Sequence, residues 1–548
     1  MLDLLSTSRV GWAIALVIGT LVLRFLQRLH FQRSLMRNLP GPPHSYVFGS
    51  LLSVAKVLAT QPSNAAPQTF IGLLREYYDL PDIFYFDPWP LGDPVMAIFR
   101  TDIANEILVK NSLPKHPIVD SFMSNFGGPA NLVSSEGKVW RKWRSAFNPG
   151  FSNSHLMTLV GQVVQDCQVF ADIMSDHAKN DDLFRLEPAS MKLTVNIIGR
   201  LVLGLDLNAQ RGRSVLLDAF SSQIRWQAQG AQFQPSELWD IRRPFVLRYN
   251  IWKMDRFITG KLEERFASST DRGKTKHIVD LALEAYRKEQ GITSDLRDMK
   301  DLDPEFKRAA ISNLKAFMFA GHDTTASAIT YSYYYLSRYP EVMAKLRKEH
   351  DDVFGPDPTT VADQLRKDGR LLNKLEYTLA VIKEVTRLAP PASTVRKAPP
   401  GYNLHDPITN EIIPTAHFMM WPVNVGINRY SKYFHNPDTF IPERFLPGNT
   451  TDNKDAWMSF SRGPRNCIGQ ELAIIELKTL LAMSVRSFDI VPAYDELDKL
   501  KDDGAGYPNL TTGILEQFGE RAYQVQMGTA KISEGLPCRT RLRSHVAS

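Results

Sequence analysis

The sequence predicts a fold built mainly from long helices, and three stretches support this. Residues 10–26 are uncharged and apolar apart from Arg24, and their length approaches the roughly 20 residues of a membrane-spanning helix. Residues 304–335 show a long helical periodicity and contain no proline after their first residue, and residues 470–477 form a short apolar helical run. The length of 548 residues by itself permits one large domain or several.

The N-terminal apolar run is expected to be a membrane anchor and not a cleaved signal peptide, because the basic residues follow it. Arg9 stands alone before the run, Arg24 lies near its end, and three more arginines come after it: Arg28, Arg33 and Arg37. The positive-inside rule then places residue 1 in the lumen and the bulk of the chain in the cytosol. Leu-Pro-Gly-Pro-Pro at residues 39–43 forms a stiff tether. The alternative is a buried N-terminal core helix.

Composition excludes several classes of protein. The net charge of +6 is small for this length, and no dense basic stripe suggests a nucleic-acid partner. Three cysteines, Cys167, Cys467 and Cys538, cannot make a disulfide framework, so a reducing compartment is expected. No internal repeat or long low-complexity tract interrupts the chain.

The most informative stretch is residues 460–469, Phe-Ser-Arg-Gly-Pro-Arg-Asn-Cys-Ile-Gly. It places Cys467 in a glycine-containing loop just before the apolar helix at residues 470–477, whose positive N-terminal end would face the sulfur. A thiolate bound to haem iron needs such N–H groups and room for a flat porphyrin, and Gly463 and Gly469 supply that room. The alternative is a buried structural cysteine.

The spacing F-x-x-G-x-R-x-C-x-G resembles the haem-ligand loop of the cytochromes P450. The other motifs of that family follow in the same order: the tether after an anchor, W-x-x-x-R at residues 140–144, A-G-H-D-T-T at residues 320–325, E-x-x-R at residues 384–387 and P-E-R-F at residues 442–445. The resemblance implies a mainly α fold with a small β region near the N-terminal part of the catalytic domain. It also implies two parts, an anchor over residues 1–38 and one catalytic domain over residues 39–548.

Carried over by motif, the resemblance assigns roles to single residues. Cys467 would ligate the iron of haem b. Thr324 would hydrogen-bond the dioxygen, and Asp323 would relay protons toward it. Residues expected to contact the haem are Trp140, Arg144, Arg396, Arg465, Phe460 and Gly463, the arginines because they can bind propionates in a bidentate manner. A buried ionic cluster behind the cysteine loop is expected from Glu384, Arg387 and Arg444.

The implied activity is that of a haem-thiolate monooxygenase, which inserts one oxygen atom from dioxygen into an apolar small molecule by hydroxylation or epoxidation. No flavin or nicotinamide fingerprint is found, so electrons are expected from a separate NADPH-cytochrome P450 reductase, with cytochrome b5 as a possible second donor. A basic docking face could be formed by Lys138, Arg141, Lys142 and Arg462, although these could also be ordinary solvated charges. The expected location is the endoplasmic reticulum membrane, with the catalytic domain facing the cytosol.

Three other functions remain open. An oxygen-independent haem-thiolate isomerase or dehydratase often lacks the acid–alcohol pair, so Asp323 and Thr324 argue against it. A non-catalytic haem sensor would need neither a proton relay nor a reductase site. A hydrolase using Cys467 as nucleophile would need a histidine base, and no motif supplies one.

The substrate is not fixed by the sequence. Contacts are expected near five segments: residues 122–130, residues 226–239, residues 316–324, the residues after Pro391, and residues 504–526. The overall texture of the sequence resembles fungal enzymes that modify secondary metabolites such as polyketides or terpenoids. One departure from the family is Asn428, where relatives often have histidine before Arg429.

Overall fold

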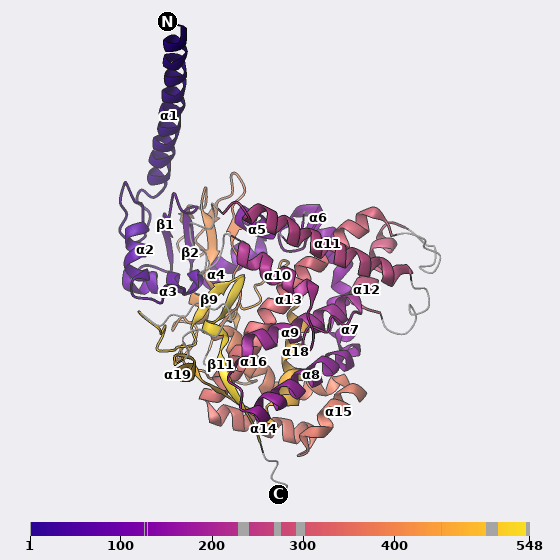
Figure 1. Ribbon diagram of the computed structural model, residues 1–548. Helices are drawn as coiled ribbons and strands as arrows, with labels where there is room; N and C mark the ends of the chain where they lie inside the picture. Colours follow the sequence, from indigo (N-terminus) through magenta and orange to yellow (C-terminus); the bar gives the residue numbers. More distant parts are fainter. Residues whose placement is uncertain are drawn as a thin grey trace.

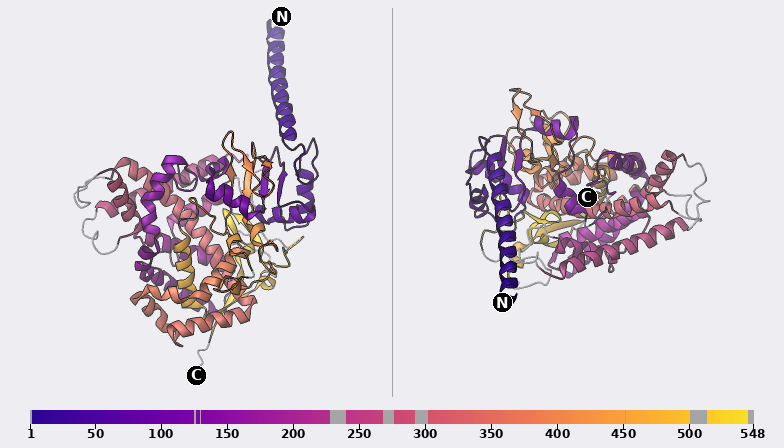
Figure 2. Two further views of the ribbon diagram at one scale, coloured as in Figure 1. Left: turned by 180° about the vertical axis from the view of Figure 1, so that it is seen from behind. Right: turned by 90° about the horizontal axis from the view of Figure 1, so that it is seen from above.

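A computed structural model describes residues 2–124, 126–128, 130–227, 240–267, 276–291, 302–450, 452–499 and 513–543. Most of the chain is helical, as expected, and the strands of the described residues form four small sheets. In Figure 1 one helix leaves the body of the protein at the N-terminal end, and the other elements pack into one mass with the strands gathered on one side. The views in Figure 2 agree that this first helix stands apart from the body.

The α-helices are given with their bounds: α1 (Leu2–Leu35), α2 (Leu51–Leu58), α3 (Pro67–Tyr77), α4 (Thr101–Asn105), α5 (Pro117–Met123), α6 (Gly137–Phe147), α7 (Asn153–Thr158), α8 (Val160–Asn180), α9 (Leu186–Ile198), α10 (Val215–Trp226), α11 (Arg243–Ala267), α12 (Ile278–Glu289), α13 (Pro304–Arg338), α14 (Pro340–Phe354), α15 (Val361–Lys367), α16 (Glu376–Leu388), α17 (Asn424–Asn428), α18 (Gln470–Ser484) and α19 (Tyr494–Leu497).

The strands are short and come from distant parts of the chain: β1 (Ile83–Phe86), β2 (Val95–Ile98), β3 (Phe184–Arg185), β4 (Arg396–Lys397), β5 (Leu404–His405), β6 (Ile412–Ile413), β7 (Met419–Pro422), β8 (Phe488–Pro492), β9 (Gln524–Met527), β10 (Thr529–Ile532) and β11 (Pro537–Leu542). The largest sheet has the order β1-β2-β7-β4, with β2 and β7 parallel. The β structure therefore extends beyond the N-terminal part of the domain, since β8 to β11 belong to the C-terminal part.

Helix α13 is the central element of the largest apolar core. Asp303 caps its N-terminus by accepting hydrogen bonds from the backbone N–H groups of Glu305 and Phe306, and Pro304 occupies the first turn, where no donor is lost. Most of its later residues are buried, and α9, α16 and α18 pack around it. A helix this long and this buried can hold side chains at fixed positions against a cofactor.

Helix α1 begins as an exposed apolar rod and ends packed on the domain. Among the described residues it is the one helix long and apolar enough to cross a membrane, over residues 11–35. Its last turns are different, because Arg33 forms a buried ion pair with Asp87 and donates to the carbonyl oxygen of Tyr46 at 2.9 Å. Arg33 therefore belongs to the packing of the domain, although it was expected to act as one of the basic residues beside the membrane.

Candidate active site

Cys467 lines a cavity of about 250 Å³. The cavity is enclosed by α13 on one side and by the loop before α18 on the other, and residues 391–394 and Met458 complete the wall. Its lining is largely apolar, with one thiol and two cationic side chains, Lys115 and Arg465, among its residues. The other two cysteines, Cys167 and Cys538, are fully buried elsewhere.

The cysteine loop is held by backbone contacts. The N–H of Cys467 donates to the carbonyl oxygen of Phe460 at 3.0 Å, and α18 starts three residues after the cysteine. Burial raises the pKa of the Cys467 thiol, while a backbone hydrogen bond at Gly469 opposes the rise. The charges of Arg144 and Lys115 also oppose it. Such N–H groups and positive charge are what a thiolate ligand requires.

Gly463 has the positive φ of 75° that favours glycine. Phe460 lies in the cavity wall. Phe460 therefore lies where a cofactor could be contacted, whereas Gly463 is not among the residues that line the cavity. Gly469 is less constrained, because the nearest atom to a Cβ built there is the Cys467 Sγ, at 4.0 Å.

Two cationic side chains, Lys115 and Arg465, are part of the cavity wall. Arg396 on β4 is not a lining residue, but its backbone forms a β-bridge with Lys115. Arg396 is fully buried, and none of its three guanidinium nitrogens has a hydrogen-bond partner among the described residues. Burial and the charge of Arg465 lower the pKa of Arg396 to about 10. Because an unpaired buried cation is unfavourable, these nitrogens point to an anionic ligand that completes the site.

Lys115 was not predicted as a site residue. Its Nζ donates to the Thr394 hydroxyl at 2.7 Å, and it lines the cavity. Burial lowers the pKa of Lys115 strongly, and the charges of Arg396 and Arg465 act in the same direction. A single lysine in a loop gives no periodic signal, so only the fold reveals that it joins the two arginines.

The remaining predicted haem contacts have different surroundings. Arg465 pairs with Glu136 at 2.6 Å, and its guanidinium lies 4.6 Å from the ring centre of Trp140. Arg144 donates two hydrogen bonds of 2.9 Å to Asn466, the residue before the cysteine. Trp140 and Arg144 therefore support the loop and Arg465 from α6, and neither is among the residues that line the cavity.

One face of α13 lines the cavity opposite the thiol. Ala320, Thr324 and Ala328 lie at helical spacing on this face, and the Thr324 hydroxyl donates to the carbonyl oxygen of Ala320 at 2.7 Å. Gly321 faces α9 instead, where a Cβ would lie 2.6 Å from the Ile198 side chain. Ala320 thus provides room for a ligand, and Gly321 permits the close approach of two helices.

Asp323 is fully buried and does not line the cavity. Its carboxylate is 2.7 Å from the Nζ of Lys531 and accepts a hydrogen bond of 2.9 Å from the backbone N–H of Thr529. The acid predicted as a proton relay is therefore held in an ion pair beside the cavity-facing Thr324.

The predicted ionic cluster is confirmed. Glu384 contacts Arg387 at 2.7 Å and Arg444 at 3.0 Å, and all three side chains are at most 1% exposed. Arg444 also pairs with Asp452 at 3.0 Å. The cluster ties α16 to the segment that precedes the cysteine loop, so it fixes the position of that loop from behind.

Asn428, the departure from the usual family sequence, fits into the same region. Its side chain donates to the carbonyl oxygen of Arg387 at 3.1 Å and accepts from the backbone N–H of Met458 at 3.3 Å. The Asn428 amide therefore joins α16 to the chain leading into the cysteine loop. Asparagine at this position, where relatives often have histidine, still makes these two hydrogen bonds.

An aromatic cluster packs around Phe319 of α13, the residue before Ala320 of the cavity wall. Phe126 stacks on Phe319 with 4.6 Å between ring centres, and Phe122 and Phe220 lie against the same group. Two of the five expected substrate segments, residues 122–130 and 316–324, therefore meet here. Residues 228–239 and 504–512, which belong to two others, lie outside the described part of the chain.

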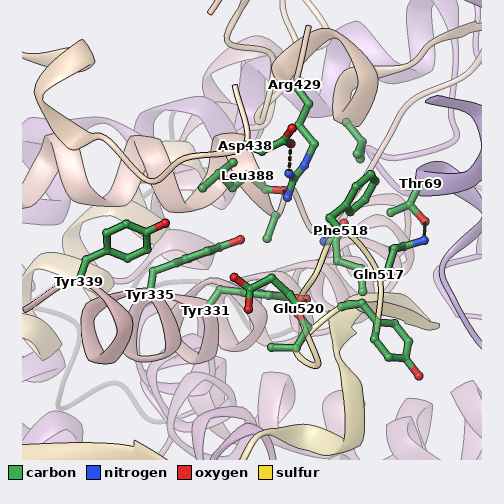
Figure 3. Close-up of a pocket in the computed structure, with 15 residues that line it drawn as sticks. Thr69, Tyr331, Tyr335, Tyr339, Leu388, Arg429, Asp438, Gln517, Phe518 and Glu520 are labelled. Atoms are coloured by element: carbon green, nitrogen blue, oxygen red, sulfur yellow. Dashed lines mark hydrogen bonds and ion pairs between the residues drawn. The ribbon is translucent and has the colours of Figure 1, made fainter. Parts of the chain in front are cut away.

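A second, smaller pocket of about 60 Å³ lies near the C-terminal half of α13. In Figure 3, Tyr331 and Tyr335 follow one another along α13, Tyr339 comes directly after its end, and Arg429 forms an ion pair with Asp438 at 2.5 Å. Cys467 is not among its lining residues. This pocket is therefore separate from the cysteine site.

Comparison with known proteins decides the family. The model of the family described as Cytochrome P450 matches residues 39–514. The chain belongs to the cytochrome P450 family. This match begins at the tether that follows the apolar helix, and it includes every motif of the candidate site.

The chain is 37% identical to the cytochrome P450 monooxygenase polC of Polytolypa hystricis, over 98% of this chain and 96% of the relative. It is 33% identical to the cytochrome P450 monooxygenase acrF of Aspergillus aculeatus, over 88% of this chain and 98% of the relative. These similarities show that the protein is a P450 monooxygenase, an oxidoreductase of the haem-thiolate class.

Solved structures agree on the fold. A crystal structure of a cytochrome P450 (CYP102L1) matches with a TM-score of 0.71 at 20% identity, covering 92% of this chain and 99% of that one. Members of this family bind haem through a cysteine thiolate. The donor set of the cavity fits this cofactor, with one thiol on an apolar face and two cationic side chains in its wall.

Proposed function

We propose that Cys467 is the iron ligand of the haem in this P450. The observation that carries the proposal is that Cys467, alone among the described cysteines, lines the cavity. The guanidinium of Arg396, which has no hydrogen-bond partner among the described residues, supports a propionate beside Lys115. Arg465 and Lys115 would bind the same carboxylates, and Trp140 and Arg144 would support them from α6.

When bound, the haem supplies the activation of dioxygen with two electrons and the transfer of one oxygen atom to the substrate. The side chains of this chain bind and orient the reactants and move protons. Thr324 offers a hydroxyl on the cavity face of α13, already hydrogen-bonded within the helix. Asp323 on the adjoining face would supply protons to it.

We infer that the substrate is an apolar small molecule that is hydroxylated or epoxidised. The cavity wall is largely apolar, and Phe319 of the aromatic cluster directly precedes the lining residue Ala320. Such walls bind hydrocarbon surface well and give a polar ligand few partners. The two fungal monooxygenases at 37% and 33% identity support a role in secondary metabolism.

An external reductase would supply the electrons, because the sequence contains no flavin or nicotinamide fingerprint. Lys138 and Arg141 are exposed on α6 and remain candidates for its docking face. Lys142 forms an ion pair with Glu305 at 2.7 Å, and Arg462 forms one with Asp455 at 3.5 Å. These two cations therefore already have partners within the chain. The apolar rod of α1 supports anchoring in the endoplasmic reticulum membrane with the catalytic domain in the cytosol.

Two measurements test the function, one on the producing strain and one on the purified enzyme. Metabolite profiles of a strain with and without the gene identify the substrate as the compound that accumulates. Purified enzyme should then convert this compound only when NADPH, reductase and dioxygen are all present. Conversion without dioxygen would support the isomerase or dehydratase, and binding without conversion would support the sensor.

A further inference from the structure

The pocket of about 60 Å³ beside the C-terminal half of α13 contains two polar groups without a protein partner. Arg429 lines this pocket, and its buried Nε has no hydrogen-bond partner among the described residues. Tyr335 lines it as well, and its hydroxyl makes no hydrogen bond within the same part of the chain. Figure 3 shows this hydroxyl pointing into the pocket. An acceptor oxygen of a bound molecule would satisfy both donors.

The charged groups of this pocket already have counter-charges. Arg429 forms an ion pair with Asp438 at 2.5 Å. Glu520 accepts a hydrogen bond from the Tyr334 hydroxyl and lies 3.3 Å from Arg338. A charged ligand would lose its hydration here without gaining an unpaired charge of opposite sign, so the pocket favours an uncharged molecule.

A turn with an unusual backbone forms one wall of the pocket. Gln517 and Glu520 exchange two backbone hydrogen bonds of 3.0 Å, and the two residues between them have positive φ, 55° for Phe518 and 73° for Gly519. Asparagine or glycine is usual at the first of these positions, and a phenylalanine there is strained. Strain of this kind is common where a segment clamps a ligand or switches between two states.

The Phe518 ring covers a cation instead of entering the core. It is 44% exposed, and the Arg429 guanidinium lies 4.8 Å from its ring centre. A cavity that holds one aromatic ring measures about 150 Å³, so the present pocket accepts a small polar group and no further ring. Because the Phe518 ring is partly in water, it can leave Arg429 without opening a hole in the core. A ligand ring can then take its place.

We propose that this pocket is a second small-molecule site of the protein, with Phe518 as its plug. The ligand is an uncharged aromatic compound with a carbonyl oxygen on a short side arm. Its ring replaces that of Phe518 on the guanidinium face, where the cation–π contact is kept. Its side arm enters the pocket, and the oxygen accepts from Arg429 Nε and from the Tyr335 hydroxyl.

The walls of this pocket continue into the walls of the cysteine cavity. Leu388 lines the pocket, and residues 391–394, which follow shortly after it, line the cavity. Val425 lines the pocket, and its neighbour Asn424 lines the cavity. Arg429 donates to the carbonyl oxygen of Leu388 at 3.1 Å. A ligand on Arg429 therefore acts on segments that also shape the cavity, so each site should change the affinity of the other.

The first test uses 2-phenylacetamide, which is uncharged and carries a carbonyl group one carbon away from its ring. Its dissociation constant is measured by calorimetry on the full-length haem-loaded protein. Phe518→Ala should bind it at least about threefold more tightly than the wild type, because no plug competes for the guanidinium face. Phe245→Ala is the matched control, since Phe245 on α11 is 71% exposed and does not line the pocket. It should bind like the wild type.

The second test examines the hydrogen bond and the charge of the ligand. Adding Tyr335→Phe to Phe518→Ala should weaken binding by about three- to tenfold, because one hydrogen bond is lost. Tyr333→Phe in the same background is the control, since Tyr333 lies on the same helix, is hydrogen-bonded to Ser484 at 2.5 Å and does not line the pocket. Phenylacetate and 2-phenylethylamine have a similar shape but opposite charges, and each should bind at least about tenfold more weakly than the amide.

Three results would overturn the proposed site. They are no binding of the amide to Phe518→Ala, an affinity of that variant equal to the wild type, and tighter binding of either charged probe than of the amide. Equal affinity with and without the Tyr335 hydroxyl would likewise exclude the assigned hydrogen bond and with it the ligand class.

Imidazole binding to the haem iron measures the coupling of the two sites. Its dissociation constant should shift by a factor that levels off as 2-phenylacetamide saturates the pocket, and Tyr335→Phe should raise the amide concentration at which this happens. A probe that entered the cavity itself would compete with imidazole without limit and equally in every variant, which would overturn the second site. An unchanged imidazole affinity at a saturated pocket would overturn the coupling.

Discussion

The backbone of Gly463 passes so close to Leu108 that a Cβ built at residue 463 would lie 2.3 Å from the Leu108 carbonyl oxygen. Both the contact and the φ of 75° exclude a side chain. Gly463→Ala should therefore displace the cysteine loop, with a cost of at least about 1–3 kcal/mol from backbone strain alone. The measurements are the free energy of unfolding and the haem content of the purified protein.

Gly72→Ala is the matched control for this variant. Gly72 lies inside α3, and a Cβ there would meet no atom within 4 Å. Alanine favours the helix over glycine by up to about 1 kcal/mol, so this variant should be at least as stable as the wild type. Equal haem content in both alanine variants would contradict the close-contact argument.

Replacing Cys467 by serine should abolish the long-wavelength Soret band of the ferrous carbon monoxide complex, because a serine hydroxyl donates much less electron density to iron. Cys167→Ala is the control, since Cys167 is buried away from the cavity. It should keep the band. A Cys467→Ser protein with the wild-type band would show that the ligand is another residue.

Replacing Arg396 by methionine should have opposite effects on the apoprotein and on haem binding. The variant removes a buried cation whose guanidinium nitrogens have no hydrogen-bond partner in the described part of the chain, so the free energy of unfolding of the apoprotein should stay equal or increase. Haem should dissociate faster, because a propionate partner is lost. The measurements are denaturant unfolding without haem and haem transfer to an acceptor protein.

Arg387→Met provides the comparison. Arg387 is paired with Glu384 at 2.7 Å and fully buried, so its removal leaves a buried carboxylate with one partner fewer. A loss of about 3–5 kcal/mol is expected with and without haem. If Arg396→Met destabilised the apoprotein as much as Arg387→Met, the assignment of Arg396 to an anionic ligand would be wrong.

Thr324→Ala should leave haem binding and reduction intact and lower the amount of product formed per NADPH consumed. The hydroxyl on the cavity face is lost, so reducing equivalents should be diverted to peroxide. Thr330→Ala is the control, because Thr330 makes the same hydrogen bond within α13, to Ala326 at 2.6 Å, and does not line the cavity. Unchanged coupling in Thr324→Ala would remove its assigned role.

The site of truncation should decide whether the released domain is stable. Deleting residues 1–28 removes the exposed part of α1 and keeps Arg33 on Asp87. Deleting residues 1–38 removes Arg33 and leaves the fully buried Asp87 without this partner, which should cost about 3–5 kcal/mol. Both forms should leave the membrane fraction, and the shorter form should unfold at a lower denaturant concentration.

Asp87→Asn in the shorter form should recover part of the lost stability, because an amide carries no charge to compensate. If the two truncations unfolded at the same denaturant concentration, the Arg33–Asp87 pair would contribute nothing. If both stayed in the membrane fraction, the apolar part of α1 would not be the main anchor.

Local spacing was enough to predict much of this protein. The cysteine loop, the Thr324 helix and the cluster of Glu384, Arg387 and Arg444 carry their information within short stretches, because a loop before a helix and one helical turn fix the relative positions of nearby residues. The apolar N-terminal helix could likewise be predicted, since length and lack of charge are properties of the segment itself.

The tertiary structure decided how single charged residues are used. Lys115 and Lys531 stand alone in their local sequences, and Arg33 is one of several arginines near the apolar run, so no local pattern indicates the partner of any of the three. Asp323 and its hydrogen-bond donor Thr529 are 206 positions apart, and the return of the β9–β10 hairpin onto α13 brings them together. A buried charge needs a partner wherever the chain can supply one, so its partner depends on the fold and not on neighbouring residues.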